Sequence, residues 1–158
     1  MTGDGLPRLA LHVTPVQASM AAVMAAECQL GYEPRDVSSQ KCGYDIESRI
    51  PQMGQLRFIE VKGRIAGASN VTVTKNEIIT ALNKPEDFIL VLVQVPKSEE
   101  FTEGDAWKVK ASRGTYKVRE NDCVIRYLRH PFHKEPDFAV TSVNYDWHEL
   151  WQRGTAPS

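Results

Sequence analysis

Apolar residues near the start of the chain recur at helical spacing. The positions on this stripe are Val16, Met20, Val23, Met24 and Leu30. Residues three and four apart share one face of a helix, so we expect a helix packed through this stripe. Thr14 and Gln17 match a capping box, Pro15 suits the first turn, and Gly31 favours the end of the helix. Residues 1–13 show no clear periodicity and are predicted to be a lead-in segment.

Strand-like patterns follow the first helix. Residues 32–37 and 43–50 are predicted strands, and 56–62 is expected to pair with 43–50 as a hairpin across a turn at 51–55. Alternation within 43–50 places Tyr44 and Ile46 on one face and Asp45 and Glu47 on the other. A loop is expected over 63–70, with a brief return to the sheet at 71–73.

The middle of the chain predicts a helix followed by a buried strand. Thr74 and Glu77 form a second capping box, and Pro85 ends that helix near Lys84. Phe88–Val95 is almost continuously apolar, which is typical of a strand that is buried on both faces. The order helix, three strands, helix, strand predicts an α/β fold built on a mixed sheet.

The C-terminal part predicts further antiparallel strands over 107–111, 115–119 and 123–128. A short closing helix is expected over 146–152, with Trp147, Leu150 and Trp151 facing inward. These elements predict one domain over residues 14–153, followed by a disordered tail at 154–158.

Composition predicts a soluble cytoplasmic protein. The 158 residues suit one domain, and 19 Lys and Arg against 20 Asp and Glu give a net charge of −1. The three cysteines are widely spaced, which favours reduced thiols over a disulfide framework or a zinc site. No apolar run approaches the ~20 residues that span a bilayer, and no signal peptide is recognisable, so no membrane partner is expected.

Basic residues are concentrated between residues 107 and 134, where eight Lys or Arg accompany only two acids. This basic lobe is suited to lie along a phosphate backbone, and the alternative is an ordinary solvated surface. Unpaired N–H groups at the start of the second helix also favour anions. The candidate nucleic-acid contacts are Arg64, Lys75, Asn76, Arg126 and Arg129.

The residues that indicate chemistry are Asp45 and, after fourteen intervening positions, Glu60-Val61-Lys62. Side chains alternate along a strand, so Glu60 and Lys62 share a face, and the hairpin can bring Asp45 beside them. Two neighbouring carboxylates repel each other unless a cation lies between them, and Mg²⁺ or Mn²⁺ suits oxygen ligands. Lys62 can orient an attacking water and stabilise developing charge. The alternative is a surface salt bridge between Glu60 and Lys62.

Glu27 is an acid in the middle of the apolar stripe of the first helix. Such a position is costly unless a partner compensates the charge. Glu27 is therefore a candidate third metal ligand, alongside Asp45 and Glu60. The alternatives are an acid at the rim of the core or one paired with an arginine. Glu77 is explained by its capping box alone.

Several stretches together resemble the "protein NO VEIN" C-terminal domain family. They include Gly43-Tyr44-Asp45-Ile46-Glu47-Ser48, Arg57-Phe58-Ile59-Glu60-Val61-Lys62-Gly63-Arg64 and Val71-Thr72-Val73-Thr74-Lys75-Asn76-Glu77-Ile78. The resemblance covers roughly residues 16–152 and departs from the PD-(D/E)XK pattern in having Tyr44 at the proline position. It implies a restriction-endonuclease-like fold, as found at the C-terminus of bacterial superfamily-two helicases.

The resemblance implies that Asp45, Glu60 and Lys62 are the catalytic set of a metal-dependent DNA endonuclease. It also implies a role in DNA processing or anti-phage defence, beside a helicase that is encoded with or fused to the domain. Two alternatives remain open: a non-catalytic module that targets DNA for a helicase, and a protein-interaction domain with a relic nuclease fold.

Overall fold

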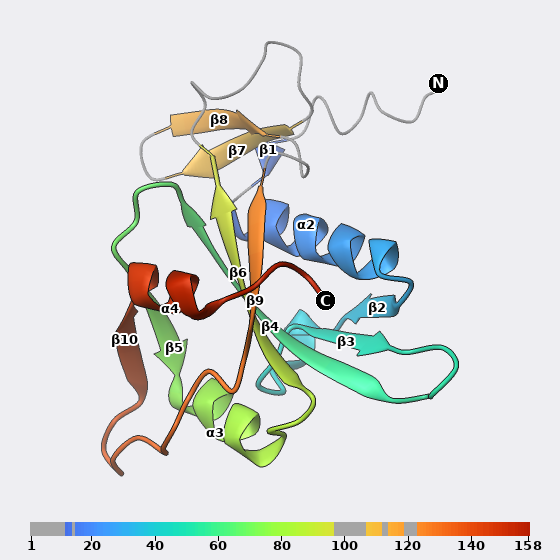
Figure 1. Cartoon of the computed structure of the whole chain (residues 1–158). Coiled ribbons are helices and arrows are strands. Elements are labelled where there is room, and N and C mark those ends of the chain that lie inside the picture. The colour runs from blue at the N-terminus through green and yellow to red at the C-terminus, as the bar shows by residue number, and fades with distance from the viewer. Residues whose placement is uncertain (1–11, 14, 97–106, 112–113, 119–122) are drawn as a thin grey trace.

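The computed structural model describes residues 12–13, 15–96, 107–111, 114–118 and 123–158, with side chains described in 15–96 and 123–158 (Figure 1). The elements are β1 (His12–Val13), α2 (Pro15–Gln29), β2 (Glu33–Asp36), the 3-10 turn η1 (Ser38–Gln40), β3 (Ile46–Arg49), β4 (Leu56–Ile65), β5 (Asn70–Thr74), α3 (Lys75–Asn83), β6 (Phe88–Val95), β7 (Trp107–Ala111), β8 (Gly114–Val118), β9 (Val124–Arg129), β10 (Ser142–Asp146) and α4 (Trp147–Arg153). Among these described elements, no helix is long and apolar enough to cross a membrane. The expected Thr14 cap lies outside the described residues.

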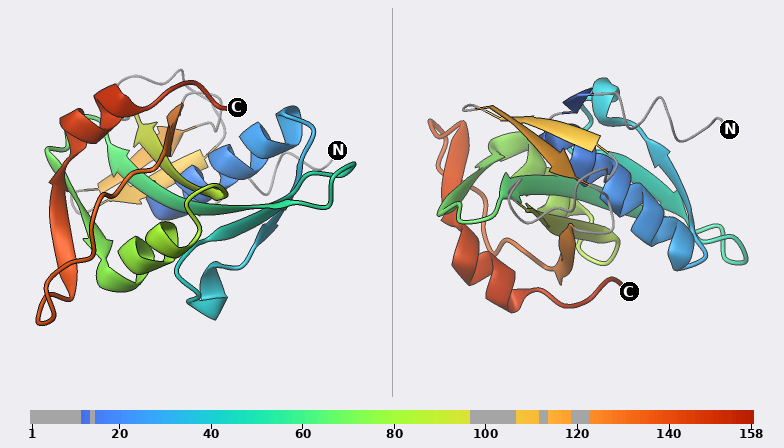
Figure 2. Two further views of the ribbon diagram at one scale, coloured as in Figure 1. Left: turned by 60° about the horizontal axis from the view of Figure 1, so that its bottom comes forward. Right: turned by 90° about the horizontal axis from the view of Figure 1, so that it is seen from above.

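The central feature is a five-stranded sheet with the order β2-β3-β4-β6-β9. β4 and β6 are parallel, and the other neighbouring strands are antiparallel. β5 and α3 connect the two parallel strands, as a crossover between parallel strands requires. The fold is therefore the expected mixed α/β sheet. Figure 2 shows the β3–β4 hairpin extending beyond the ends of α2 and α3.

β6 lies inside the sheet and divides the core into two layers. Ile89, Val91 and Val93 pack against the α2 side, while Leu90 and Leu92 pack against the side that carries α3 and α4. All five side chains are at most 2% exposed. The expectation of a strand buried on both faces is confirmed.

The N-terminal half of α2 meets the sheet through small side chains. Ala18, Ser19 and Ala22 are buried, whereas Val16 is 65% exposed. The predicted stripe is therefore wrong at Val16. The chain brings α2 so close to β4 that a Cβ built on Gly63 would lie 1.8 Å from Ser19 Oγ. Large side chains do not fit at such a close approach, so the small residues face inward.

We expect Gly63→Ala to destabilise the protein by about 2 kcal/mol, because the added methyl group must push α2 away from β4. Chemical denaturation would measure the change. After Ser19 is replaced by glycine, the nearest remaining atom to the new Cβ is Pro15 O at 3.5 Å. Ser19→Gly combined with Gly63→Ala should thus recover part of the loss. If Gly63→Ala alone were as stable as wild type, the close approach of α2 to β4 would be contradicted.

The predicted stop of α2 and the predicted start of α3 are confirmed. Thr74 and Glu77 form the predicted capping box of α3. At the end of α2, Gly31 has φ +89° and its N–H bonds to Cys28 O, while Tyr32 N–H bonds to Glu27 O. This pair of bonds is a Schellman motif, which needs a residue in the left-handed region and so favours glycine.

Three differences from the expected elements concern strands. β4 continues to Ile65, so the connection to β5 is shorter than the predicted loop. β5 pairs with β10 in a separate two-stranded sheet, and β10 itself was not predicted. β3 begins only at Ile46, so the alternation does not reach back to Tyr44, which packs against Phe58 on the other side of the sheet from Ile46.

The C-terminal elements follow the prediction more closely. β7 and β8 form an antiparallel hairpin, and β9 adds to the edge of the main sheet. α4 buries Trp147 and Leu150. The expectation of a disordered tail at 154–158 is wrong. Thr155 and Tyr127 exchange two main-chain hydrogen bonds of 2.8 Å, and Ser158 accepts further bonds from two arginines.

Candidate functional site

Asp45 lies immediately before β3 and is turned toward β4. Its main-chain N–H donates to Ile59 O at 2.8 Å, which joins this segment to β4. Its carboxylate Oδ2 accepts a hydrogen bond of 2.9 Å from the main-chain N–H of Val61. The side chain is therefore fixed beside the two residues that flank Val61.

Glu60 and Lys62 share one face of β4, as their spacing predicts. Glu60 is only 4% exposed, and Lys62 Nζ lies 3.3 Å from Glu60 Oε2. The carboxyl group of Asp45 also lies close enough to Glu60 and Lys62 for their charges to affect its pKa and that of Glu60. The structure thus brings together all three residues of the predicted catalytic set.

Glu77 is a fourth member of this group that the sequence did not single out. Its Oε1 lies 2.9 Å from Lys62 Nζ and also accepts a 2.9 Å hydrogen bond from the main-chain N–H of Thr74. The capping pattern was a sufficient explanation for Glu77, so nothing in the sequence called for a second role. Asp45, Glu60, Lys62 and Glu77 together are the acid–lysine site.

Burial and mutual repulsion change the protonation of the site. Burial, followed by the nearby charges of Asp45 and Glu77, raises the pKa of Glu60 to about 10. Burial also raises the pKa of Asp45. For Lys62, burial alone would lower the pKa, but the carboxylates of Glu60 and Glu77 outweigh it and raise the pKa. The resting site therefore favours a protonated Glu60 and a charged Lys62.

The chemistry of these donors fits a divalent cation. When all three acids are ionised, the acid–lysine site carries an excess of negative charge that a divalent cation would neutralise. Within the part of the chain that the structure describes, no three acids, histidines or cysteines are arranged as a complete metal-binding cluster. Asp45 and Glu60 would accordingly share Mg²⁺ with a main-chain carbonyl and water, which this ion commonly retains.

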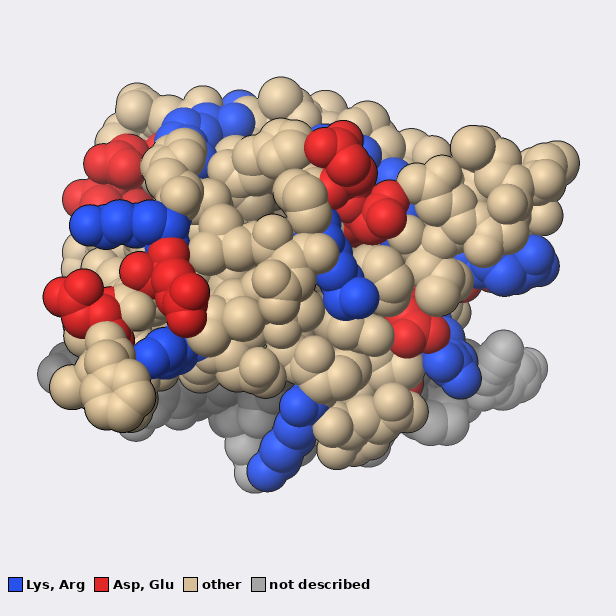
Figure 3. Space-filling model, turned by 90° about the horizontal axis from the view of Figure 1, so that it is seen from below, with Lys and Arg blue, Asp and Glu red and all other residues tan. Residues whose placement is uncertain are grey.

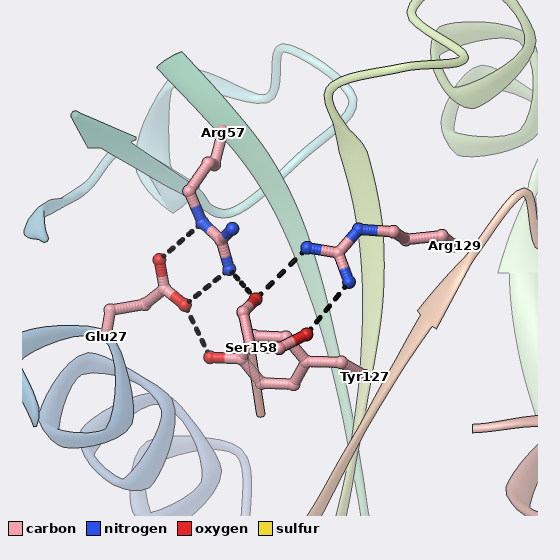
Figure 4. Close-up of polar contacts among 5 residues, drawn as sticks. All are labelled: Glu27, Arg57, Tyr127, Arg129 and Ser158. Atoms are coloured by element: carbon pink, nitrogen blue, oxygen red, sulfur yellow. Dashed lines mark hydrogen bonds and ion pairs between the residues drawn. The ribbon is translucent and has the colours of Figure 1, made fainter. Parts of the chain in front are cut away.

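Glu27 is not part of this site, which corrects its assignment as a third metal ligand. It is completely buried on the α2 side of the sheet, where Arg57 Nε and Nη2 each lie 3.0 Å from its carboxylate (Figure 4). Tyr127 also donates its hydroxyl hydrogen to Glu27. Arg57 and Glu60 point to opposite faces of β4, so Glu27 and the acid–lysine site are separated by the sheet. The alternative of an acid paired with an arginine is confirmed.

The candidate nucleic-acid contacts of β9 do not form one surface. Arg126 is half-buried, donates to Gly154 O and lies over the ring of Trp151, and its contact with nucleic acid stays a prediction. Arg129 is exposed and donates to Ser158 on the α2 side (Figure 4). The remaining basic side chains between residues 107 and 122 lie outside the described side chains.

The other candidate contacts lie near the start of α3 and the end of β4. Lys75 Nζ donates to Phe138 O at 3.1 Å, and Arg64 Nη1 donates to Asn70 O at 2.6 Å. Asn76 is exposed. On the face of the molecule seen from below, basic and acidic side chains are interspersed (Figure 3). Nucleic-acid contact by these residues stays a prediction.

Comparison with known proteins adds one finding. The family model described as Protein NO VEIN, C-terminal, matches residues 17–103. No curated protein and no solved structure matches the chain. The matched region contains every residue of the acid–lysine site.

Proposed function

The chain belongs to the Protein NO VEIN, C-terminal, family, and from this membership and the site geometry we propose that it is a metal-dependent nuclease domain that hydrolyses phosphodiester bonds in DNA. The observation that carries the proposal is the convergence of Asp45, Glu60 and Lys62. A buried acid, a half-buried acid and an ammonium group meet on one face of the sheet, where Lys62 pairs with Glu60 and Asp45 accepts the Val61 N–H between them. A merely solvated salt bridge would not require the second acid or the burial.

Each residue has a chemical task in this proposal. Asp45 and Glu60 would hold Mg²⁺ or Mn²⁺, which supplies charge neutralisation at the phosphate and a more acidic bound water. Lys62 would orient the attacking water and stabilise the negative charge that grows on the phosphate oxygens. The low exposure of Glu60 and Lys62 strengthens these electrostatic interactions, because water screens them poorly.

Cleavage of plasmid and single-stranded DNA tests the proposal. We expect wild type to cut with Mg²⁺ or Mn²⁺ and not with EDTA, and Asp45→Asn and Lys62→Ala to lose at least about 100-fold in rate. Glu86→Gln is the matched control, because Glu86 is an exposed acid beyond the end of α3. Equal activity in wild type, Asp45→Asn and Lys62→Ala would reject the proposal.

The biological setting that we propose is DNA processing or anti-phage defence in the cytoplasm, beside a helicase that is encoded with or fused to the domain. The support for it is the resemblance to helicase-borne relatives. A pull-down of the full-length protein with the helicase from its own genomic neighbourhood, with and without DNA, would test the partnership.

A second candidate is a non-catalytic module that binds DNA or a protein of the helicase system. The observation that favours it is the pairing of Lys62 with both Glu60 and Glu77, which partly satisfies the site without a metal ion. This alternative predicts salt-dependent DNA binding that survives Glu60→Ala and weakens on charge reversal at Lys75 or Arg129. DNA binding that is unchanged by both charge reversals would count against this alternative.

A further inference from the structure

We propose that Glu77 is the positioning residue for Lys62, because its carboxylate joins the ammonium of β4 to the rigid first turn of α3. This inference rests on the proposed function, since positioning matters only if Lys62 acts on a substrate. It gives Glu77 a second role in addition to its capping of α3. The observation behind it is that Glu77 Oε1 lies 2.9 Å from Lys62 Nζ.

Glu77 is held independently of Lys62. Its main-chain N–H donates to Thr74 Oγ1 at 3.2 Å, and its Oε1 accepts from Thr74 N at 2.9 Å. These two bonds fix both the backbone and the side chain of Glu77 at the third position of the helix. A carboxylate immobilised in this way loses little conformational freedom when it also binds an ammonium group.

Lys62 needs such a support because a lysine side chain has four rotatable bonds and no fixed geometry. In the present structure the Lys62 ammonium group pairs with both Glu60, at 3.3 Å, and Glu77, at 2.9 Å. If Glu60 ligates a divalent cation, the positive charge beside it weakens its attraction for the ammonium. Asp45 is engaged by Val61 N–H. Glu77 is then the remaining anion of the acid–lysine site that can keep Lys62 in place.

Two substitutions separate positioning from capping. Glu77→Gln keeps an oxygen that can accept the Thr74 N–H, as glutamine does in capping boxes, but removes the charge that attracts Lys62. Thr74→Ala removes the hydroxyl cap and leaves the Lys62–Glu77 pair. Thr74→Ala should therefore lower the melting temperature by about 2–4 °C without releasing Lys62.

The first measurement is the rate at which acetic anhydride modifies Lys62 in the metal-free full chain, followed by mass spectrometry and normalised to the exposed Lys41. Lys62 is 16% exposed while it is paired. We expect Glu77→Gln to accelerate its acetylation at least about threefold, because the released side chain reaches solvent. Thr74→Ala should leave the rate unchanged. An unchanged rate in Glu77→Gln, or an equal acceleration in Thr74→Ala, would overturn the proposal.

The second measurement is steady-state DNA cleavage. We expect Glu77→Gln to lower kcat about 10- to 100-fold while KM changes by less than about twofold, because a mispositioned group costs rate rather than affinity. Thr74→Ala should retain kcat below its melting temperature. Wild-type kcat in Glu77→Gln would overturn the role. If wild type does not cleave DNA but Glu77→Gln alone accelerates acetylation, the proposed nuclease function fails and the positioning of Lys62 by Glu77 is supported.

Discussion

At pH 8, metal-free Glu60→Gln is expected to be more stable than wild type by roughly 1–3 kcal/mol, which corresponds to a melting temperature about 5 °C higher. Glu60 is 4% exposed and lies beside Asp45 and Glu77. The folded protein therefore favours the uncharged form of Glu60. Glutamine has the same shape and carries no charge at any pH, so it removes the cost of burying the anion.

The pH dependence distinguishes this explanation from better packing. The pKa of Glu60 is about 10 in the folded protein, against an ordinary value of 4.5 for a solvated glutamate. Below the lower value both states are protonated, and the stabilising contribution is fully present. As pH rises from 4.5 toward 10, the unfolded chain loses its proton first and the contribution is lost. Wild type and Glu60→Gln should consequently have similar stability near pH 4 and diverge as the pH increases.

Glu47→Gln is the matched control for Glu60→Gln. Hydrogen bonds from Arg35 and then from Tyr44 lower the pKa of Glu47, so its contribution to stability has the opposite dependence on pH. Because Arg35 is 67% exposed, we expect this control to lose no more than about 1 kcal/mol. Parallel stability curves for wild type and Glu60→Gln from pH 4 to 10 would contradict the assignment of a protonated Glu60.

Glu60→Gln should also remove metal binding and DNA cleavage. Mg²⁺ or Mn²⁺ is expected to raise the melting temperature of wild type, since an ion that binds only the folded state stabilises it, and to leave Glu60→Gln unchanged. DNA cleavage by the variant should fall by at least about 100-fold. Glu60 would then support activity while it lowers the stability of the fold, as the trade-off between stability and activity predicts.

Local patterns in the sequence predict most of the fold because their determinants are short-range. The capping box of Thr74 and Glu77 and the apolar run Phe88–Val95 each need only neighbouring residues. The same holds for Glu60 and Lys62, whose common face follows from strand alternation. The hairpin between β3 and β4 then brings Asp45 close, so the grouping of these three residues follows from local patterns.

The features that were missed depend on contacts between distant segments. Glu27 finds its partner Arg57 thirty positions away, across a helix-to-sheet interface that periodicity does not describe. Glu77 reaches Lys62 only because α3 packs beside β4. The small inward face of α2 follows from its close approach to Gly63, which no pattern within the helix reveals. Each of these needs the three-dimensional arrangement of elements.

Arg57→Met is expected to destabilise the protein by about 3–5 kcal/mol, a fall in melting temperature of about 10 °C, because it leaves the Glu27 carboxylate buried without its cation. Glu27 is 0% exposed and Arg57 is 7% exposed, so neither can turn to water without opening the core. Arg57 also donates to Ser158 O at 2.8 Å and lies 4.4 Å above the ring of Tyr32. Its loss consequently loosens contacts between α2, β4 and the C-terminal segment (Figure 4).

Arg49→Met is the matched control, because Arg49 pairs with Glu33 on the surface and both side chains are about half exposed. We expect this exposed pair to contribute less than about 1 kcal/mol. Combining Arg57→Met with Glu27→Gln should recover part of the stability, since the unpaired charge is removed together with its partner. Below its melting temperature, Arg57→Met should keep the wild-type cleavage rate and metal affinity, because the sheet separates Arg57 from the acid–lysine site. If Glu27→Gln lost metal affinity at a temperature where it is folded, Glu27 would instead be supported as a metal ligand.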